Sequence, residues 1–157
     1  MAFENVDYKS LDIPAAPFSD PSIIPDFPKN KVPRHIGVIM DGNGRWAQQR
    51  GLIRTDGHQA AEPVVFDTIA GAIEAGVRYL SLYTFSTENW KRSADEVGAL
   101  MQLFRFYMVR LLKIASANNV RVKMIGDRTR FDRDIIEGIN RLESETQDNT
   151  GLTFVIA

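Results

Sequence analysis

The segment HIGVIMDGNGRWAQQRGLIR, residues 35–54, joins a short apolar run to a glycine-rich turn at a single carboxylate. The run IGVIM is β-branched and uninterrupted, which is typical of a strand buried in a parallel sheet. Asp41 lies at the carboxyl end of this run. Ligands of open α/β sheets bind beyond the carboxyl ends of strands, so the segment predicts a binding site at this turn.

The turn after Asp41 has the composition of an anion site. Gly42 and Gly44 allow close approach of a ligand to the backbone N–H groups, and Arg45 adds a planar guanidinium for phosphate oxygens. A carboxylate beside a diphosphate is repelled unless a divalent cation lies between them, and one carboxylate with phosphate oxygens and water suits Mg²⁺. The residues alone also permit an ordinary turn after a strand.

Composition sets the frame for this site. The chain has 157 residues, 44% of them apolar, which suits one domain with a sizeable core. The absence of cysteine excludes disulfides and thiolate metal sites and fits a cytoplasmic location. A net charge of −1 argues against nucleic acid as a partner. No apolar segment reaches the roughly 20 residues of a transmembrane helix.

Residues 1–33 are predicted to form an extended, proline-rich arm before an α/β domain over residues 34–157. Prolines 14, 17, 21, 25 and 28 are spaced so that neither a helix nor an interior strand can persist. We expect the arm to dock partly on the surface of the domain, with a partly disordered tail as the alternative. The apolar side chains that could pack there are Phe18, Ile23, Ile24 and Phe27.

After the arm, apolar strands alternate with amphipathic helices. Strands are predicted at 36–40, 79–85, 120–126 and 152–157, and helices at 45–50, 58–75, 94–117 and 132–147. Ser93 and Glu96 have the spacing of a capping box at the start of the longest helix. This alternation predicts an α/β fold with a mainly parallel sheet flanked by helices on both faces.

A second polar cluster follows the second strand. Ser86, Thr87, Glu88 and Asn89 offer hydroxyl, carboxylate and amide groups at a strand end, where they can meet Asp41. Trp90 adds an apolar surface, which would suit a ligand that is part phosphate and part hydrocarbon. A capped loop with a core tryptophan explains the same string equally well. Arg54 and His58 form a third, weaker group.

Five strings carry a family resemblance: HIGVIMDGNGRW, GLIRTDGH, LYTFSTENWKRSADEV, NNVRVKMIGD and DNTGLTFVIA. Together they resemble the cis-prenyltransferases, the isoprenyl transferases that make undecaprenyl diphosphate and related polyprenyl diphosphates. The resemblance covers about Val32 to the last residue. It implies an enzyme that condenses isopentenyl diphosphate with an allylic diphosphate, such as farnesyl or geranyl diphosphate, to give a cis-polyprenyl diphosphate.

The resemblance also implies roles for single residues. Asp41 would be the catalytic, Mg²⁺-associated residue, and Asn89 matches the position of the family's proton acceptor. An amide has no useful basicity near neutral pH, so we expect Asn89 to orient a water or the substrate's own diphosphate. Substrate binding is implied for Gly42, Asn43, Gly44, Arg45, Trp46, Arg54, His58, Ser86, Thr87, Glu88, Trp90 and Arg92.

A growing hydrocarbon needs an apolar sleeve, and the resemblance assigns this role to the longest helix. Its periodicity alone favours ordinary core packing. Thr84, usually alanine in the family, is expected to narrow the sleeve slightly. The candidate lining residues on the helix are Leu100, Leu103, Phe104, Tyr107, Met108, Leu111 and Leu112.

The family further implies a homodimer that supplies a cell-wall precursor, located in the cytoplasm or peripherally on the membrane. Its members continue after the fourth strand into an N-Y-G-G-R segment. We therefore expect this chain to be an N-terminal portion with little elongation activity and with its last strand at an exposed edge. The alternatives are a non-catalytic prenyltransferase-like subunit and a different phosphate-binding α/β enzyme, although the Walker and dinucleotide motifs are missing.

Overall fold

The computed structural model of the protein describes residues 28–157. Of the predicted arm, only its end falls within this range: Lys29–Lys31 form the 3₁₀ helix η4, and Val32 packs against the core. The expected docking of the remaining arm residues lies outside the described residues, and it concerns Phe18, Ile23, Ile24 and Phe27.

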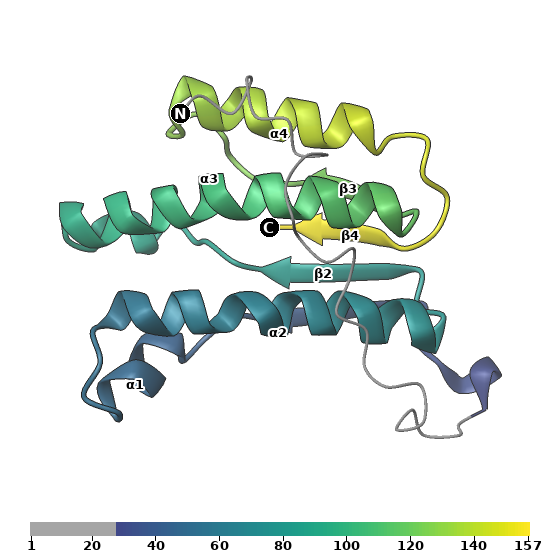
Figure 1. The fold of residues 1–157 in the computed structure, drawn as a ribbon, viewed down its shortest axis with the longest axis horizontal. Coiled ribbons are helices and arrows are strands. Elements are labelled where there is room, and N and C mark those ends of the chain that lie inside the picture. The colour runs from purple at the N-terminus through teal and green to yellow at the C-terminus, as the bar shows by residue number, and fades with distance from the viewer. Residues whose placement is uncertain (1–27) are drawn as a thin grey trace.

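The described strands form one parallel sheet in the order β1-β2-β4-β3, of which Figure 1 labels the neighbours β2, β4 and β3. Their bounds are β1 His35–Ile39, β2 Tyr79–Tyr83, β3 Arg121–Met124 and β4 Thr153–Ile156. The last strand therefore lies inside the sheet, between β2 and β3. The expectation that it is left at an exposed edge is wrong, because the connection from β3 returns the chain to the space beside β2.

The predicted alternation of strands and helices is confirmed. Gly76 ends the second helix of the chain in a left-handed conformation, as the sequence predicted. This helix begins one turn earlier than expected, because the Asp56 carboxylate accepts the N–H of Ile53 at 3.3 Å. The helices are α1 Asn43–Gln48, α2 Arg54–Ala75, α3 Ala94–Ala117 and α4 Arg133–Glu145, with a 3₁₀ turn, η5, at Asn89–Lys91.

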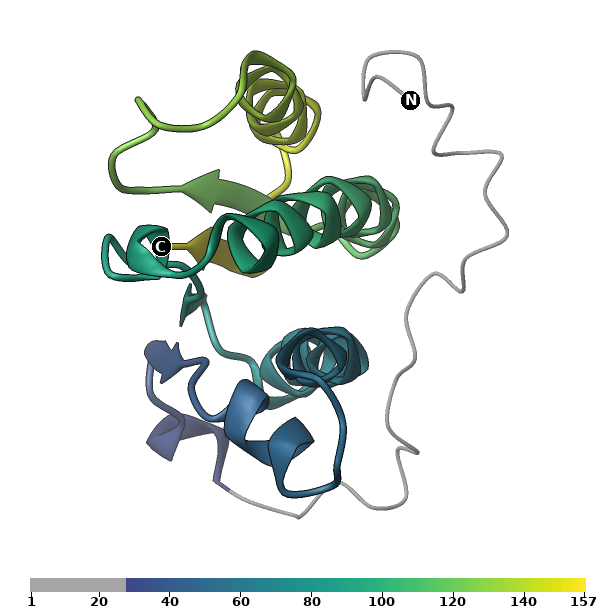
Figure 2. The same ribbon diagram turned by 90° about the vertical axis from the view of Figure 1, so that its left-hand side faces the viewer.

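The parallel α/β fold with flanking helices agrees with the prediction. The prediction also placed helices on both faces of the sheet, and here the two faces differ. In residues 28–157 the buried strand side chains, such as Leu80 and Phe154, share one face, and α2 and α3 lie against it (Figure 2). The opposite face carries Tyr79 and Tyr83, whose exposed fractions are 43% and 49%. The helices of the described segment thus create one deep apolar layer.

Helix α4 lies along the free edge of β3. The N–H groups of Val122 and Met124, which point away from β4, donate to Thr146 Oγ1 at 3.0 Å and Glu143 Oε1 at 2.9 Å. Side chains of α4 thus replace the missing strand partner and protect this edge from pairing with another chain. No helix of the described segment is long and apolar enough to cross a membrane.

Candidate active site

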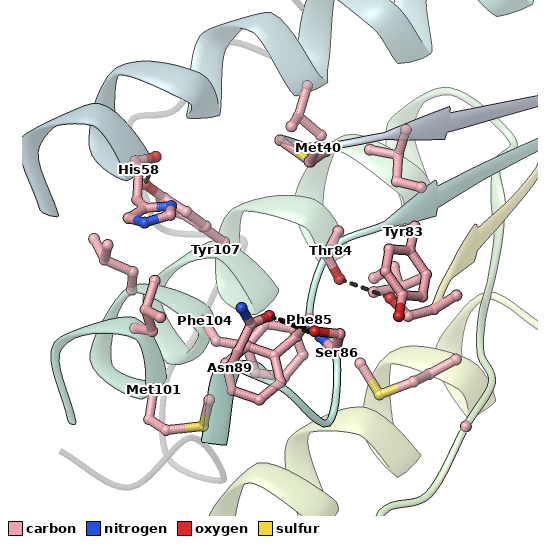
Figure 3. Close-up of a pocket in the computed structure, with 18 of the residues that line it drawn as sticks. Met40, His58, Tyr83, Thr84, Phe85, Ser86, Asn89, Met101, Phe104 and Tyr107 are labelled. Atoms are coloured by element: carbon pink, nitrogen blue, oxygen red, sulfur yellow. Dashed lines mark hydrogen bonds between the residues drawn. The ribbon is translucent and has the colours of Figure 1, made fainter. Parts of the chain in front are cut away.

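The two polar loops predicted to meet do lie together, at the carboxyl edge of the sheet. A cavity of about 480 Å³ lies beneath them, between the sheet and helices α2 and α3 (Figure 3). Asn43, His58, Ser86 and Asn89 line its polar end, and side chains of α3 such as Phe104 line its apolar wall. This shape suits a ligand with a charged head and a hydrocarbon tail.

The Asp41 carboxylate lies outside the cavity lining, in the turn between β1 and α1. It accepts the N–H of Gly42 at 2.6 Å and the Arg45 guanidinium at 2.8 Å. These contacts lower the pKa of Asp41: the hydrogen bond from the Gly42 N–H is the largest single cause, followed by the charge of Arg45. Both side chains are largely exposed, at 75% for Asp41 and 69% for Arg45, so the ion pair is easily exchanged for other partners.

Two glycines let α1 pack directly on α2. A Cβ atom at Gly57 would collide with the backbone carbonyl of Asn43, and one at Gly44 would lie 2.8 Å from the guanidinium carbon of Arg54. Gly42, with φ of 88°, makes the left-handed turn that starts α1. The turn after Asp41 is therefore held against the first turn of α2 by backbone contact.

Glu96 holds two arginines at the mouth of the cavity. Its Oε1 accepts Arg54 Nε at 3.3 Å and Arg92 Nη1 at 2.8 Å. Burial raises the pKa of Glu96, but the hydrogen bond from Arg54 and the charge of Arg92 outweigh burial and leave this pKa below its usual value. The carboxylate therefore stays ionised and fixes both guanidinium groups.

Glu96 shows that only half of the predicted capping box is present. Its N–H donates to Ser93 Oγ at 3.3 Å, as expected, but its carboxylate bonds to the arginines instead of the Ser93 backbone. Because the spacing from Ser93 explains Glu96 as a helix cap, the sequence did not indicate a role for this residue in the site. The signal that could have revealed it is the (i, i+4) spacing of Arg92 and Glu96 beside the polar loop.

The His58 imidazole points toward the polar end of the cavity (Figure 3). Burial, followed by the charge of Arg92, lowers the pKa of His58, so the ring is neutral near pH 7. Its Nε2 is buried and has no hydrogen-bond partner among residues 28–157. A buried ring nitrogen without a partner is a candidate contact for a ligand.

Asn89 uses its oxygen inside its own loop. Asn89 Oδ1 accepts the Ser86 N–H at 2.7 Å and the Ser86 hydroxyl at 3.3 Å. The remaining group of this amide, its NH₂, faces the cavity and can only donate hydrogen bonds (Figure 3). This arrangement supports the expectation that Asn89 orients a ligand instead of accepting a proton.

Trp90 satisfies both interpretations of its loop. It lines the cavity and also packs against Phe85 and Phe131, with ring centroids 5.0 and 5.8 Å away. Arg130, from the loop after β3, lies over the Trp90 ring at 4.5 Å. The indole thus connects the loops that follow β2 and β3 at the mouth of the cavity.

The predicted site residues divide into two groups. Seven line the cavity: Asn43, His58, Ser86, Thr87, Asn89, Trp90 and Arg92. The others surround its mouth or lie farther from it, and they are Asp41, Gly42, Gly44, Arg45, Trp46, Arg54 and Glu88. Trp46 is 41% exposed and stacks beneath Arg50 at 4.3 Å, so it does not face the cavity.

The apolar stripe on α3 does face the cavity. Leu112 is fully buried and is absent from the lining, which corrects the stripe at one position. Thr84 lines the cavity, and its hydroxyl donates to the carbonyl of Ala157 at 3.1 Å. The predicted stripe residues that line the cavity are Leu100, Leu103, Phe104, Tyr107, Met108 and Leu111.

The carboxylates near the mouth fit a metal that needs few protein ligands. No group of three or more His, Cys, Asp or Glu side chains able to hold a metal occurs in residues 28–157. Asp41 is a single exposed carboxylate beside the turn that is predicted to bind an anion. Mg²⁺ commonly takes one or two carboxylates and completes its coordination with phosphate oxygens and water.

Comparisons with known proteins identify similar chains. Residues 39–157 match the family model described as "Putative undecaprenyl diphosphate synthase". An isoprenyl transferase of Bifidobacterium longum is 68% identical over 155 residues, which are 99% of this chain and 59% of that protein. A Thermobifida fusca trans,polycis-polyprenyl diphosphate synthase, named as (2Z,6E)-farnesyl diphosphate specific, is 48% identical over 90% of this chain and 50% of its own length.

A solved structure supports the same relation. The lavandulyl diphosphate synthase of Lavandula x intermedia, in complex with dimethylallyl diphosphate, matches with a TM-score of 0.77 and 28% identity. The match covers 80% of this chain and 54% of that protein. The chain thus spans little more than half the length of the relatives that it matches.

The packing of α1 on α2 yields a matched pair of glycine substitutions. Gly57→Ala should destabilise the fold and displace the turn at Asn43, because the added methyl group meets a backbone carbonyl. Gly71→Ala, in the same helix with open space around it, should stabilise the protein by about 0.5–1 kcal/mol. Urea unfolding measures both, and equal changes in the free energy of unfolding would contradict the close approach.

Proposed function

The chain belongs to the undecaprenyl diphosphate synthase family of prenyltransferases, and from this premise we propose the activity of the complete protein. It condenses isopentenyl diphosphate with an allylic diphosphate, such as farnesyl or geranyl diphosphate, to give a cis-polyprenyl diphosphate. One observation carries this proposal. A mouth with three arginines and a half-buried histidine opens directly into an apolar cavity of about 480 Å³.

The charged groups suit the chemistry of allylic transfer. As the new carbon–carbon bond forms, negative charge grows on the departing diphosphate, so fixed positive groups around it lower the barrier. Arg54 and Arg92 are already oriented by Glu96, which reduces the reorganisation needed during the reaction. Arg45 can leave its exposed pair with Asp41 and bind the same diphosphate.

Asp41 is the residue that would hold Mg²⁺ beside the diphosphate. The metal, when bound, would neutralise charge on the leaving group. Asn89 orients the substrate through its NH₂ group, because its oxygen is bonded to Ser86. We expect the proton released from the condensing isopentenyl unit to pass to a diphosphate oxygen or a water, because the Asn89 amide has no useful basicity near neutral pH.

Family membership also supports proposals about the setting of the complete protein. We expect a homodimer in the cytoplasm, peripherally associated with the membrane, whose product serves as a precursor carrier for the cell wall. These expectations come from the family alone.

Ligand binding by the 157-residue chain is the direct test of the proposed substrate class. Isothermal titration should show binding of farnesyl diphosphate that weakens when EDTA removes Mg²⁺, because the metal screens repulsion between Asp41 and the diphosphate. Farnesyl diphosphate should bind more tightly than isopentenyl diphosphate, which cannot fill the apolar cavity. Tighter binding of ATP than of farnesyl diphosphate would instead favour a nucleotide enzyme.

Two neighbouring arginines separate a close contact from general attraction. Arg45→Ala should weaken farnesyl diphosphate binding about tenfold or more, the effect of losing one charge-assisted hydrogen bond. Arg50→Ala is the control, because Arg50 lies over Trp46 and donates to the Trp46 carbonyl at 3.2 Å. Titrations at fixed ionic strength decide between the two, and similar losses would indicate only diffuse charge attraction.

Asp41→Ala in the complete protein should lower turnover by roughly 10² to 10⁴ while allylic diphosphate binding largely survives. The readout is incorporation of labelled isopentenyl diphosphate at saturating Mg²⁺. Asp67→Ala, at an exposed position on α2, is the charge-matched control and should retain full activity. Near-normal elongation by the Asp41 variant would show that its assigned role is wrong.

A further inference from the structure

The apolar wall of the cavity contains one carboxylate that the mechanism does not use. Glu62 lies on α2 one helical turn after His58, so its side chain follows the imidazole along the same face, about 6 Å deeper. Its side chain is only 13% exposed, and it lines the cavity among apolar neighbours such as Val65 and Phe66. A hydrocarbon attached to a diphosphate at the mouth must pass this carboxylate.

Arg110 on α3 is the partner of Glu62 across the cavity wall. Arg110 Nη1 lies 2.8 Å from Glu62 Oε1, and the guanidinium lies over the rings of Phe66 and Phe106 at 5.6 and 5.7 Å. One turn nearer the mouth, the Tyr107 hydroxyl donates to the His58 carbonyl at 3.3 Å. Together with Arg54–Glu96 at the mouth and Tyr107–His58 behind it, the Glu62–Arg110 pair therefore forms a third polar bridge between α2 and α3.

The Glu62–Arg110 pair is incompletely satisfied. Glu62 Oε1 and Arg110 Nε are buried, and neither has a hydrogen bond of good geometry within residues 28–157, although the ions are in contact. Burial raises the pKa of Glu62, and the charge of Arg110 offsets this rise only in part. Buried ion pairs with unfilled hydrogen-bonding capacity contribute little to stability, and apolar replacements of similar volume often stabilise. A contribution to ligand selection explains the pair better.

We propose that the Glu62–Arg110 pair determines specificity by favouring short allylic chains over long ones in this cavity. This inference rests on the proposed function, which places the diphosphate at the mouth. A five-carbon chain ends before Glu62, whereas a fifteen-carbon chain reaches the carboxylate and excludes water from the part of the pair that is still exposed. Excluding water from a partly exposed ion pair is unfavourable, so the pair offsets part of the gain from burying the longer hydrocarbon.

The test compares two ligands on the 157-residue chain. Isothermal titration at fixed Mg²⁺ gives the dissociation constants of dimethylallyl diphosphate and farnesyl diphosphate. In Glu62→Leu/Arg110→Met, which replaces the pair by apolar side chains, the preference for farnesyl diphosphate should rise about tenfold. Glu62→Ala alone should change the preference in the same direction. Thermal unfolding of the double variant should show a midpoint equal to or above that of the parent chain, whereas Glu62→Ala, which leaves Arg110 without its partner, should lower the midpoint.

Arg141→Met/Glu145→Leu is the matched control. It removes an ion pair on α4, outside the cavity, whose arginine is about as exposed as Arg110, and should leave the preference between the two ligands unchanged. An unchanged preference in both Glu62 variants overturns this inference while leaving the proposed function intact. If the parent chain binds neither diphosphate, the proposed function fails first and this inference fails with it.

Discussion

The insertion of β4 between β2 and β3 decides which side chains meet at the site. It separates the two strands that precede the loops of Trp90 and Arg130, yet keeps both loops at one edge because all four strands are parallel. The width added by β4 also provides the floor of the cavity, through Phe154 and Ile156. Helices α2 and α3 enclose the apolar space against this strand and β2, which contributes Leu82.

The site combines rigid and exchangeable electrostatic contacts. Backbone packing at Gly57 and the Glu96 carboxylate fix the first turn of α2 and two guanidinium groups before a ligand arrives. The Asp41–Arg45 pair is exposed, so its separation costs little. This arrangement suits an anionic ligand. The fixed guanidinium groups can stabilise its charge without reorganisation, and the exposed pair can separate so that Arg45 contacts the ligand as well.

Periodicity and turn residues were sufficient to predict the helices and strands, because each of these elements is determined by residues that are close together in the sequence. The order of the strands was not predictable in this way, because strand pairing depends on distant residues and residues 152–157 alone do not determine that their strand lies between β2 and β3. The polar loops were predicted because strand ends converge, whereas Glu96 was mistaken for a cap. Glu62 and Arg110, 48 positions apart, resemble ordinary surface charges until the helices pack together.

The central claim is that the loops after β1 and β2 form one diphosphate site that continues into the cavity along α3. Hydrogen–deuterium exchange of the 157-residue chain, with and without farnesyl diphosphate and Mg²⁺, tests it most directly. We expect slower exchange in residues 42–46, in residues 86–92 and in the middle of α3, whereas inorganic diphosphate should slow only the two loops. Protection of one loop alone, or of the exposed sheet face around Tyr79 and Tyr83, would contradict the claim.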